Sequence, residues 1–169
     1  MTLDPETASA GLYLSEDCKL MQWQGREQGL PYNPRRFKSG PFVLGSRGFT
    51  SGWHRWDVEI CGVDVWAIGV AKACQKGPLS SLQPDPVIWA LCHNSGRYEA
   101  LTSTNVTPLT LCSVPKRIRI CLYCEEGRLE FFDTKRKKQI FAMEQASFQG
   151  ERVFPWFMVR GKTCLKLLP

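Results

Sequence analysis

The chain has 169 residues, of which 43% are hydrophobic and 11% aromatic, and it carries a net charge of +6. This is enough apolar material for one packed core, and no apolar run approaches the roughly 18 residues that a membrane span requires. The N-terminus also lacks the basic-then-apolar layout of a signal peptide. We therefore expect a soluble, cytoplasmic segment without membrane contact, whose positive charge alone specifies neither fold nor ligand.

The first predicted element is a capped single turn of helix over residues 4–7. Asp4 is a preferred N-cap residue and Pro5 suits the first helical position. A second short helical turn is expected over residues 145–148. Pro- and Gly-rich stretches at 29–34 and 77–86 predict long loops.

Between these segments the dominant hydrophobic period is two, which predicts strands. In residues 55–60 and again in 117–122, large apolar side chains alternate mostly with charged ones, as in a strand with one buried and one solvated face. In residues 66–71 they alternate with Ala and Gly, which predicts a central strand covered on both faces. Turn residues at 94–96 and 125–127 separate further strands, and the latter turn predicts a hairpin. The chain is therefore predicted to be all-β.

Eight cysteines are scattered without a repeated spacing, which predicts free thiols in a reducing compartment. Cys121 and Cys124 alone have a spacing like that of a zinc ligand pair. Residues three apart on a strand face opposite sides, so we expect no metal there and no cofactor elsewhere.

Catalytic motifs are missing from the sequence. The two histidines, His54 and His93, have no nucleophile at a recognisable spacing, and Cys92 would point to the opposite face of a strand from His93. The hydrolase, phosphate-loop and zinc-protease motifs are absent as well. The chain is predicted to be non-catalytic.

The sharpest concentration of charge is a four-residue basic cluster between two apolar segments. We interpret it as a solvated hairpin turn, and the alternative is an electrostatic contact with RNA. Its members are Lys135, Arg136, Lys137 and Lys138.

Ordered motifs along nearly the whole chain resemble one family. They begin with Leu3-Asp4-Pro5-Glu6-Thr7-Ala8, Leu14-Ser15-Glu16-Asp17, Leu30-Pro31, Asn33-Pro34 and Arg36-Phe37. They continue with Val43-Leu44-Gly45, Phe49-Thr50-Ser51-Gly52, Trp56-Asp57-Val58-Glu59-Ile60, Ile68-Gly69-Val70-Ala71, Lys76-Gly77, Trp89-Ala90, Tyr98-Glu99-Ala100-Leu101-Thr102 and Phe154-Pro155-Trp156-Phe157. This series resembles the PRY–SPRY domain, the recognition module of many tripartite-motif ubiquitin ligases and of butyrophilins. Two departures are Leu122-Tyr123-Cys124-Glu125, where the family usually has Leu-Asp-Tyr-Glu, and Trp53, where it commonly has Arg.

The resemblance implies a bent antiparallel β-sandwich of two sheets, a concanavalin-like jelly roll with short N-terminal helical turns. Residues 1–52 would form the PRY segment and 53–169 the SPRY segment of one compact domain. The implied function is to bind a target protein or peptide, as the substrate-binding domain of a tripartite-motif ligase or, alternatively, as the ligand-sensing domain of a butyrophilin-like receptor. Ligase catalysis would require a RING domain, and oligomerisation would require a coiled coil; this sequence contains neither. Nucleic acid is not the expected partner.

The resemblance also implies a partner pocket on the concave sheet, walled by residues 38–42, 78–86 and 91–97. Phe42 and Leu82 would supply apolar walls, unless they merely cover the core. Arg36 and Arg97 would meet a carboxylate, and Asn94 would pair with the backbone of an extended peptide. The full predicted set is Arg36, Gly40, Phe42, Leu82, Cys92, Asn94 and Arg97.

Overall fold

The computed structural model describes residues 1–25, 41–72, 88–102 and 105–169, and these contain thirteen strands and no helix. The strands are β1 (Leu12–Leu14), β2 (Leu20–Trp23), β3 (Phe42–Leu44), β4 (Trp53–Gly62), β5 (Val65–Lys72), β6 (Ile88–Asn94), β7 (Arg97–Leu101), β8 (Val106–Leu109), β9 (Arg117–Tyr123), β10 (Arg128–Asp133), β11 (Lys138–Met143), β12 (Val153–Arg160) and β13 (Thr163–Leu167). None of the described residues forms a helix long and apolar enough to cross a membrane.

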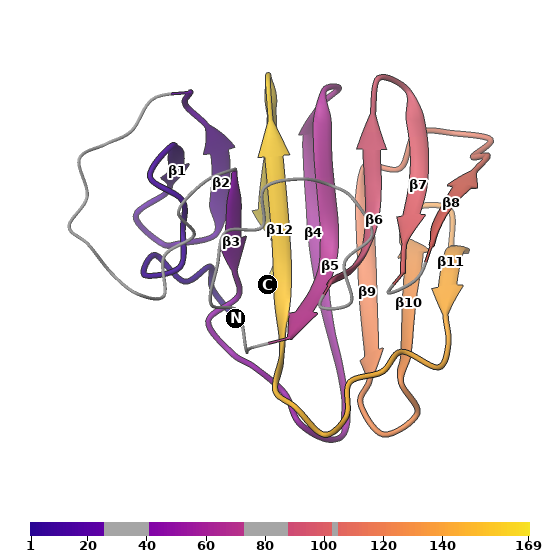
Figure 1. The fold of residues 1–169 in the computed structure, drawn as a ribbon. Coiled ribbons are helices and arrows are strands. Elements are labelled where there is room, and N and C mark those ends of the chain that lie inside the picture. The colour runs from indigo at the N-terminus through magenta and orange to yellow at the C-terminus, as the bar shows by residue number, and fades with distance from the viewer. Residues whose placement is uncertain (26–40, 73–87, 103–104) are drawn as a thin grey trace.

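The strands form two antiparallel sheets packed face to face (Figure 1). One sheet has seven strands in the order β1-β2-β13-β4-β9-β10-β11, and the other has six in the order β3-β12-β5-β6-β7-β8. Strands distant in sequence therefore become neighbours, as β4 and β13 do in the first sheet. The all-β antiparallel sandwich predicted from the sequence is confirmed.

The main core lies between the two sheets and follows the predicted alternation. Trp56, Val58 and Ile60 of β4 are buried, while the charged residues between them are exposed or half-buried. The core-facing residues of β5 are also buried, and so are the small residues that alternate with them. Because β5 is the third of six strands and is covered on both faces, its predicted central position is confirmed.

A second buried apolar cluster lies on the other face of the six-stranded sheet, which we call the outer face. Its members alternate along their strands with residues of the main core, as the period of a strand requires. We call this set the outer-face cluster: Phe42, Leu44, Ala67, Ala71, Ile88, Ala90, Cys92, Leu101, Trp156 and Met158. Gly69 lies on the same face because it alternates with Ile68 and Val70 of the main core, and a Cβ on it would approach a backbone oxygen of β6 to 2.0 Å.

The predicted N-terminal helical turn is wrong, because residues 4–7 form no helix, although the predicted cap at Asp4 is present. The Asp4 carboxylate accepts a hydrogen bond from the amide of Glu6 (3.0 Å), and its carbonyl accepts one from the amide of Thr7 (3.0 Å). The amides of Asp4 and Ser9 donate to carbonyl oxygens of β3, at 2.8 and 3.0 Å. These bonds hold the segment against the sheet after a single turn, so no helix propagates.

The helical turn predicted for residues 145–148 is likewise absent. Gln145 has a φ of +59°, outside the right-handed helical region. The amide of Ala146 donates to the carbonyl of Gly127 (2.8 Å), in the turn between β9 and β10. A long-range bond has replaced the local one that a helix would need.

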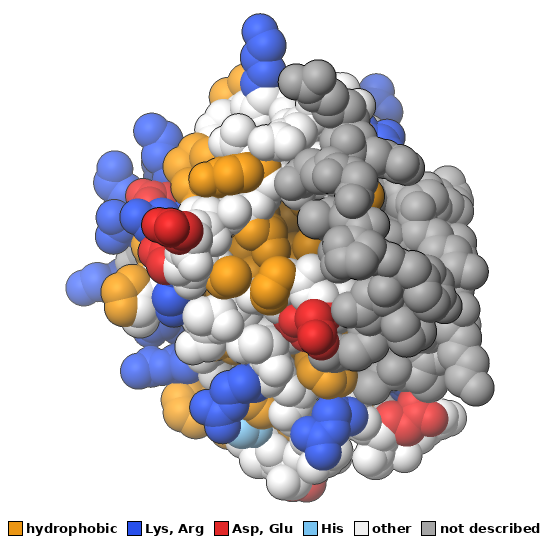
Figure 2. All heavy atoms as spheres, turned by 90° about the vertical axis from the view of Figure 1, so that its left-hand side faces the viewer, with side chains coloured by type: hydrophobic (Ala, Val, Ile, Leu, Met, Phe, Trp, Pro, Cys, Tyr) orange, Lys and Arg blue, Asp and Glu red, His pale blue; other side chains and the backbone are white. Residues whose placement is uncertain are grey.

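The surface at the β1 end of the sandwich carries both hydrophobic and charged side chains (Figure 2). Hydrophobic side chains gather near the middle of this view, and many Lys and Arg side chains project on its left. Leu14 and Trp23, at the β1–β2 edge, are half-buried and pack against the main core. The edge is therefore partly closed by apolar contacts.

Candidate partner-binding surface

The outer face of the six-stranded sheet combines an apolar floor with a polar end. In the floor, Phe42 of β3 packs on Trp156 of β12, with ring centroids 5.5 Å apart. Trp156 is fully buried, and its indole Nε1 has no hydrogen-bond partner among the described residues. Sequence reasoning did not select Trp156, although the unbroken apolar run in β12 is the signal of a strand covered on both faces.

The polar end is formed by the hairpin of β6 and β7. Asn94 pairs with Arg97 across a two-residue turn in which Ser95 and Gly96 have φ values of +53° and +79°. This geometry suits a hairpin turn, and the predicted turn at 94–96 is confirmed. Asn94 and Arg97 are exposed at the end of the sheet, on the face that carries the outer-face cluster, because side chains of register partners share a face.

Cys92 and His93 occupy opposite faces of β6, as their adjacency predicted. Cys92 is buried in the outer-face cluster, where burial and, secondly, the charge of Glu99 raise the pKa of its thiol. The His93 ring packs against Trp66 and Tyr98, with centroids 5.7 and 4.8 Å away, and its Nδ1 lies 2.6 Å from the carbonyl oxygen of Asp64. A protonated, buried thiol and a packed imidazole on opposite faces cannot act together as a nucleophile and its base.

An open hollow of about 500 Å³ adjoins the polar end of the outer face. It is lined on one side by residues 96–99 and on the other by residues 108–111, which include the end of β8. Arg97 and Glu99 give it opposite charges, and Leu109 and Leu111 give it an apolar side. A site of this kind suits a peptide segment with both polar and apolar groups.

The predicted site residues divide into three groups. Arg36, Gly40 and Leu82 lie outside the described residues. Phe42 (2% exposed) and Cys92 are buried, which is the placement of core residues, whereas Asn94 and Arg97 are exposed. Their common role in binding a partner stays a prediction.

The structure adds Glu99 and the 108–111 segment, which sequence reasoning missed. Glu99 is the register partner of Cys92 and also of Pro108, so β7 brings it to the edge of the hollow. Nothing in the local pattern marks this residue. It belongs to the surface because β8 pairs with β7.

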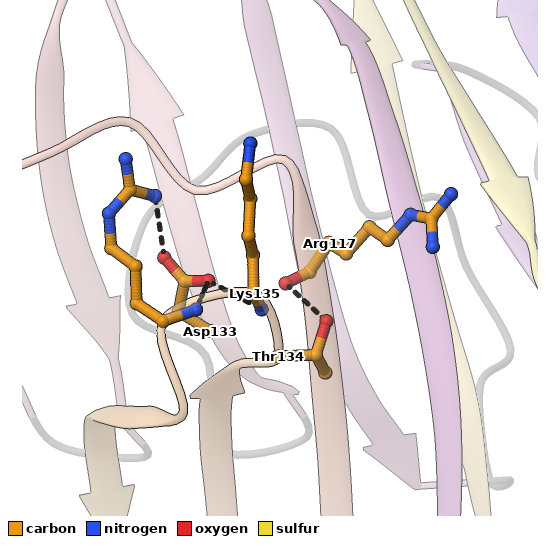
Figure 3. A network of polar contacts seen from close by, with 5 residues as sticks. Arg117, Asp133, Thr134 and Lys135 are labelled. Carbon is orange, nitrogen blue, oxygen red and sulfur yellow. Dashed lines mark hydrogen bonds and ion pairs between the residues drawn. The ribbon is translucent and has the colours of Figure 1, made fainter.

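The first three residues of the basic cluster lie in the predicted turn, here between β10 and β11, Lys138 begins β11, and all four side chains are exposed. Buried Asp133 organises this turn, as Figure 3 shows in part. One of its carboxylate oxygens accepts from the amides of Lys135 and Arg136, both at 3.1 Å, and the other accepts from the Arg136 guanidinium at 3.2 Å. The carbonyl of Arg117 accepts a further bond from the Thr134 amide at 3.1 Å.

A second hollow, of about 470 Å³, connects the basic turn with the polar end of the outer face. It shares Thr110 and Leu111 with the first hollow and is bordered by Arg136 and Lys138. Its positive border favours an acidic partner segment, while the pairing of Arg136 with Asp133 offsets part of that charge.

The residues that the structure describes form no candidate metal site. No group of three or more His, Cys, Asp or Glu side chains is placed there to hold an ion. Cys121 is buried and Cys124 half-buried. The His54 ring stacks on Phe49 at 3.8 Å, and its Nε2 lies 2.8 Å from the carbonyl oxygen of Ser51, so its contacts are structural.

Comparison with known proteins gives two adjoining family matches. The model of the SPRY-associated domain, PRY, matches residues 1–49, and that of the SPRY domain matches residues 53–168. Among curated proteins, the chain is 37% identical over 171 residues to butyrophilin subfamily 1 member A1 of Bos taurus, covering 100% of this chain and 32% of that protein. It is 39% identical over 175 residues to the E3 ubiquitin-protein ligase TRIM15 of Sus scrofa, covering 99% of this chain and 36% of that protein. The chain thus spans about a third of the length of these relatives.

Solved structures show the same fold at lower sequence identity. The TRIM65 PSpry domain superimposes with a TM-score of 0.84 at 21% identity, covering 99% of this chain and 89% of that one. Stonustoxin gives the same TM-score at 22% identity, covering 99% of this chain and 28% of that one. The sandwich is therefore shared well beyond the range of close sequence similarity.

Proposed function

The chain belongs to the SPRY family, with a PRY segment ahead of the SPRY domain, and on that basis we propose that it binds a segment of a partner protein at the polar end of the outer face. SPRY domains are non-catalytic interaction modules. The observation that carries the proposal is the 500 Å³ hollow, which joins opposite charges and apolar side chains on two paired strands. Binding groups held on a rigid sandwich are pre-organised, which lowers the entropic cost of association.

Each exposed group in the hollow has a role that follows from its chemistry. The Arg97 guanidinium donates to a carboxylate or carbonyl of the partner, and Glu99 accepts from an amide or a basic side chain. Asn94 both donates and accepts, so it suits the backbone of an extended segment. Phe42 packs on Trp156 and belongs to β3, which lies at the opposite edge of the sheet from β8, so contact between Phe42 and the partner requires a segment that extends across the outer face.

The test begins with peptides selected by display against the immobilised domain and continues with chemical-shift mapping of a selected peptide. We expect the largest amide shifts in β6, β7 and β8. Arg97→Ala should weaken binding about tenfold, as loss of a charge-assisted contact at the centre of a site does. Arg55→Ala is the matched control, because Arg55 is exposed on β4 in the opposite sheet, where its guanidinium lies 5.7 Å from the Trp53 ring. Shifts concentrated on the seven-stranded sheet would contradict the proposed site.

We propose further that the partner is the substrate of a tripartite-motif ubiquitin ligase, acting in the cytoplasm. Sequence similarity to TRIM15 supports this parent, and the seven unpaired cysteines among the described residues suit a reducing compartment. Similarity to butyrophilin supports the alternative of a ligand-sensing domain in a receptor. Sequencing the complete transcript tests the choice: RING cysteines and a coiled coil upstream would favour the ligase, and an ectodomain with a membrane span the receptor.

A second candidate is an auxiliary RNA contact at the basic turn. The four exposed cations and the bordering hollow favour it. Fluorescence anisotropy with a single-stranded RNA should then show an affinity that falls steeply with salt, with a log–log slope near one unit for each phosphate neutralised. Affinity for the RNA that is unchanged when Lys135 and Lys137 are replaced by Glu would exclude this contact.

A further inference from the structure

Two cysteines that are roughly 100 residues apart in the sequence face each other in the seven-stranded sheet. Cys61 of β4 and Cys164 of β13 are direct register partners. Their neighbours Ile60 and Leu165 are buried in the main core, so the two cysteine side chains lie together on the opposite, solvent-facing side. Among the described cysteines no second pair are register partners.

The ladder places the two residues at a separation that suits a disulfide. The amide of Leu168 donates to the carbonyl of Asp57 (2.9 Å), and hydrogen-bonded pairs alternate along an antiparallel ladder. Cys61 and Cys164 therefore form a hydrogen-bonded pair, whose Cα atoms are typically about 5.5 Å apart. Disulfides most often join Cα atoms about 5.5–6 Å apart and Cβ atoms about 3.5–4.5 Å apart. The Cβ atoms of a hydrogen-bonded pair lie about 5.5 Å apart, so closing the bond requires these two Cβ atoms to approach by roughly 1 Å.

Contacts at the adjoining turns fix this separation. The Asp64 carboxylate accepts a hydrogen bond from the amide of Lys162 (2.7 Å), and the Asp64 amide donates to the Thr163 hydroxyl (2.8 Å). Gly62 faces Thr163 so closely that a Cβ on it would lie 2.2 Å from the Lys162 carbonyl oxygen. The end of β4 and the start of β13 are thus locked together beside the two thiols.

Both thiols are accessible to a small reagent, to different degrees. They line a shallow hollow of about 380 Å³ whose border includes Trp23 and Lys162. Cys61 is exposed and Cys164 is half-buried. Burial, followed by a hydrogen bond with Cys61, raises the pKa of the Cys164 thiol to about 11, so Cys61 is the better placed of the two to react first.

We propose that Cys61 and Cys164 form a dithiol–disulfide site that is oxidised by a low-molecular-weight disulfide such as glutathione disulfide. The Cys61 thiolate attacks one sulfur of the reagent, whose S–S bond breaks and releases one glutathione thiolate. Cys164 gives its proton to solvent and attacks the Cys61 sulfur of the mixed disulfide, which releases the second glutathione thiolate. Two protein thiols are oxidised to one disulfide, and one glutathione disulfide is reduced to two thiols.

The bond would join β4 to β13 and close a loop of roughly 100 residues. Closing a loop of that length restricts the unfolded chain, and we expect the thermal midpoint to rise by about 5 °C or more. The positive Lys162 at the border of the hollow favours the approach of an anionic reagent such as glutathione. Oxidation would therefore stabilise the sandwich without changing its fold.

The 169-residue chain, titrated with glutathione disulfide at pH 8 and digested without reduction, tests the proposal by mass spectrometry. The expected product is a peptide pair joined through Cys61 and Cys164, with the intact chain lighter by two hydrogens. Cys164→Ser should trap a glutathione adduct on Cys61, whereas Cys61→Ser should leave Cys164 largely unmodified. Cys112→Ser is the matched control, because Cys112 is exposed elsewhere on the molecule and its loss should leave the bond intact.

Three results would overturn the proposal. One is a wild-type chain that stops at the mixed disulfide on Cys61, to the same extent as Cys164→Ser. Another is a disulfide that joins other cysteines. The third is a Cys61–Cys164 bond that forms only after the chain is unfolded in urea.

Discussion

Replacing Phe42 with alanine separates a structural role for this ring from an anchoring role at the binding surface. The ring is 2% exposed and packs 5.5 Å from Trp156, centroid to centroid. Truncating a buried Phe removes its transfer free energy and leaves a cavity, at a cost of about 3–5 kcal/mol. For a domain of this size that loss lowers the thermal midpoint by about 6–20 °C. The Phe42 carbonyl accepts from the Ser9 amide (3.0 Å) and the Phe42 amide donates to the Ser9 hydroxyl (3.1 Å); neither bond involves the ring, so the change reports packing.

Urea and thermal unfolding, followed by tryptophan fluorescence, measure the effect. Tyr13→Ala is the matched control, because Tyr13 is 39% exposed on the edge strand β1 and its truncation should cost about 0.5 kcal/mol or less. Suppose instead that Phe42→Ala loses less than about 1 kcal/mol while affinity for a selected peptide falls tenfold. The ring would then be an anchor for the partner, and the argument from burial would be refuted.

Three further experiments test the packing, the protonation and the surface charges. In a urea titration, Gly69→Ala should lower the free energy of unfolding by about 3 kcal/mol, because the new Cβ would lie 2.0 Å from a backbone oxygen. Gly96→Ala is the control: its Cβ would have no atom within 4 Å, and the φ of +79° should cost only about 1 kcal/mol. The pKa of the Cys92 thiol is raised in the folded state, so the unfolded chain loses this proton first as the pH rises. The free energy of unfolding should therefore fall as the pH rises above about 9. Cys92→Ala should make that fall shallower by about 1.4 kcal/mol per pH unit. The half-exposed Arg119–Asp57 pair, bonded at 2.8 and 3.0 Å, should show a coupling below about 1 kcal/mol in a double-mutant cycle; a coupling that does not shrink in 1 M salt would contradict its surface character.

The candidate surface could be predicted only in part. The turn at 94–96 was found because Gly and Asn carry a local conformational signal, and the exposure of Asn94 and Arg97 follows from that turn. Trp156 and Glu99 were missed for different reasons. Trp156 stands in an uninterrupted apolar run, whose period cannot say which face a residue takes, and Glu99 joins the surface only through the pairing of β7 with β8.

The helical turns show where local rules lose to distant bonds. Asp4 caps its turn as the sequence indicates, yet the amides on either side of that turn, those of Asp4 and Ser9, bond to β3, which lies more than thirty residues further along the chain. Ala146 bonds to Gly127 in the same manner. Capping preferences describe what a short segment favours in isolation, and a bond to a neighbouring strand satisfies the same amides without a helix.

From the sequence alone, the all-β class, the buried faces of β4 and β5, the hairpin turns and the family resemblance were determined. Each depends on the alternation of side chains along a strand or on a short motif, which neighbouring residues set among themselves. Tertiary structure alone decided the register between distant strands, and with it the meeting of Cys61 with Cys164. Register depends on hydrogen-bonded ladders between segments far apart in the chain, so no local pattern carries it.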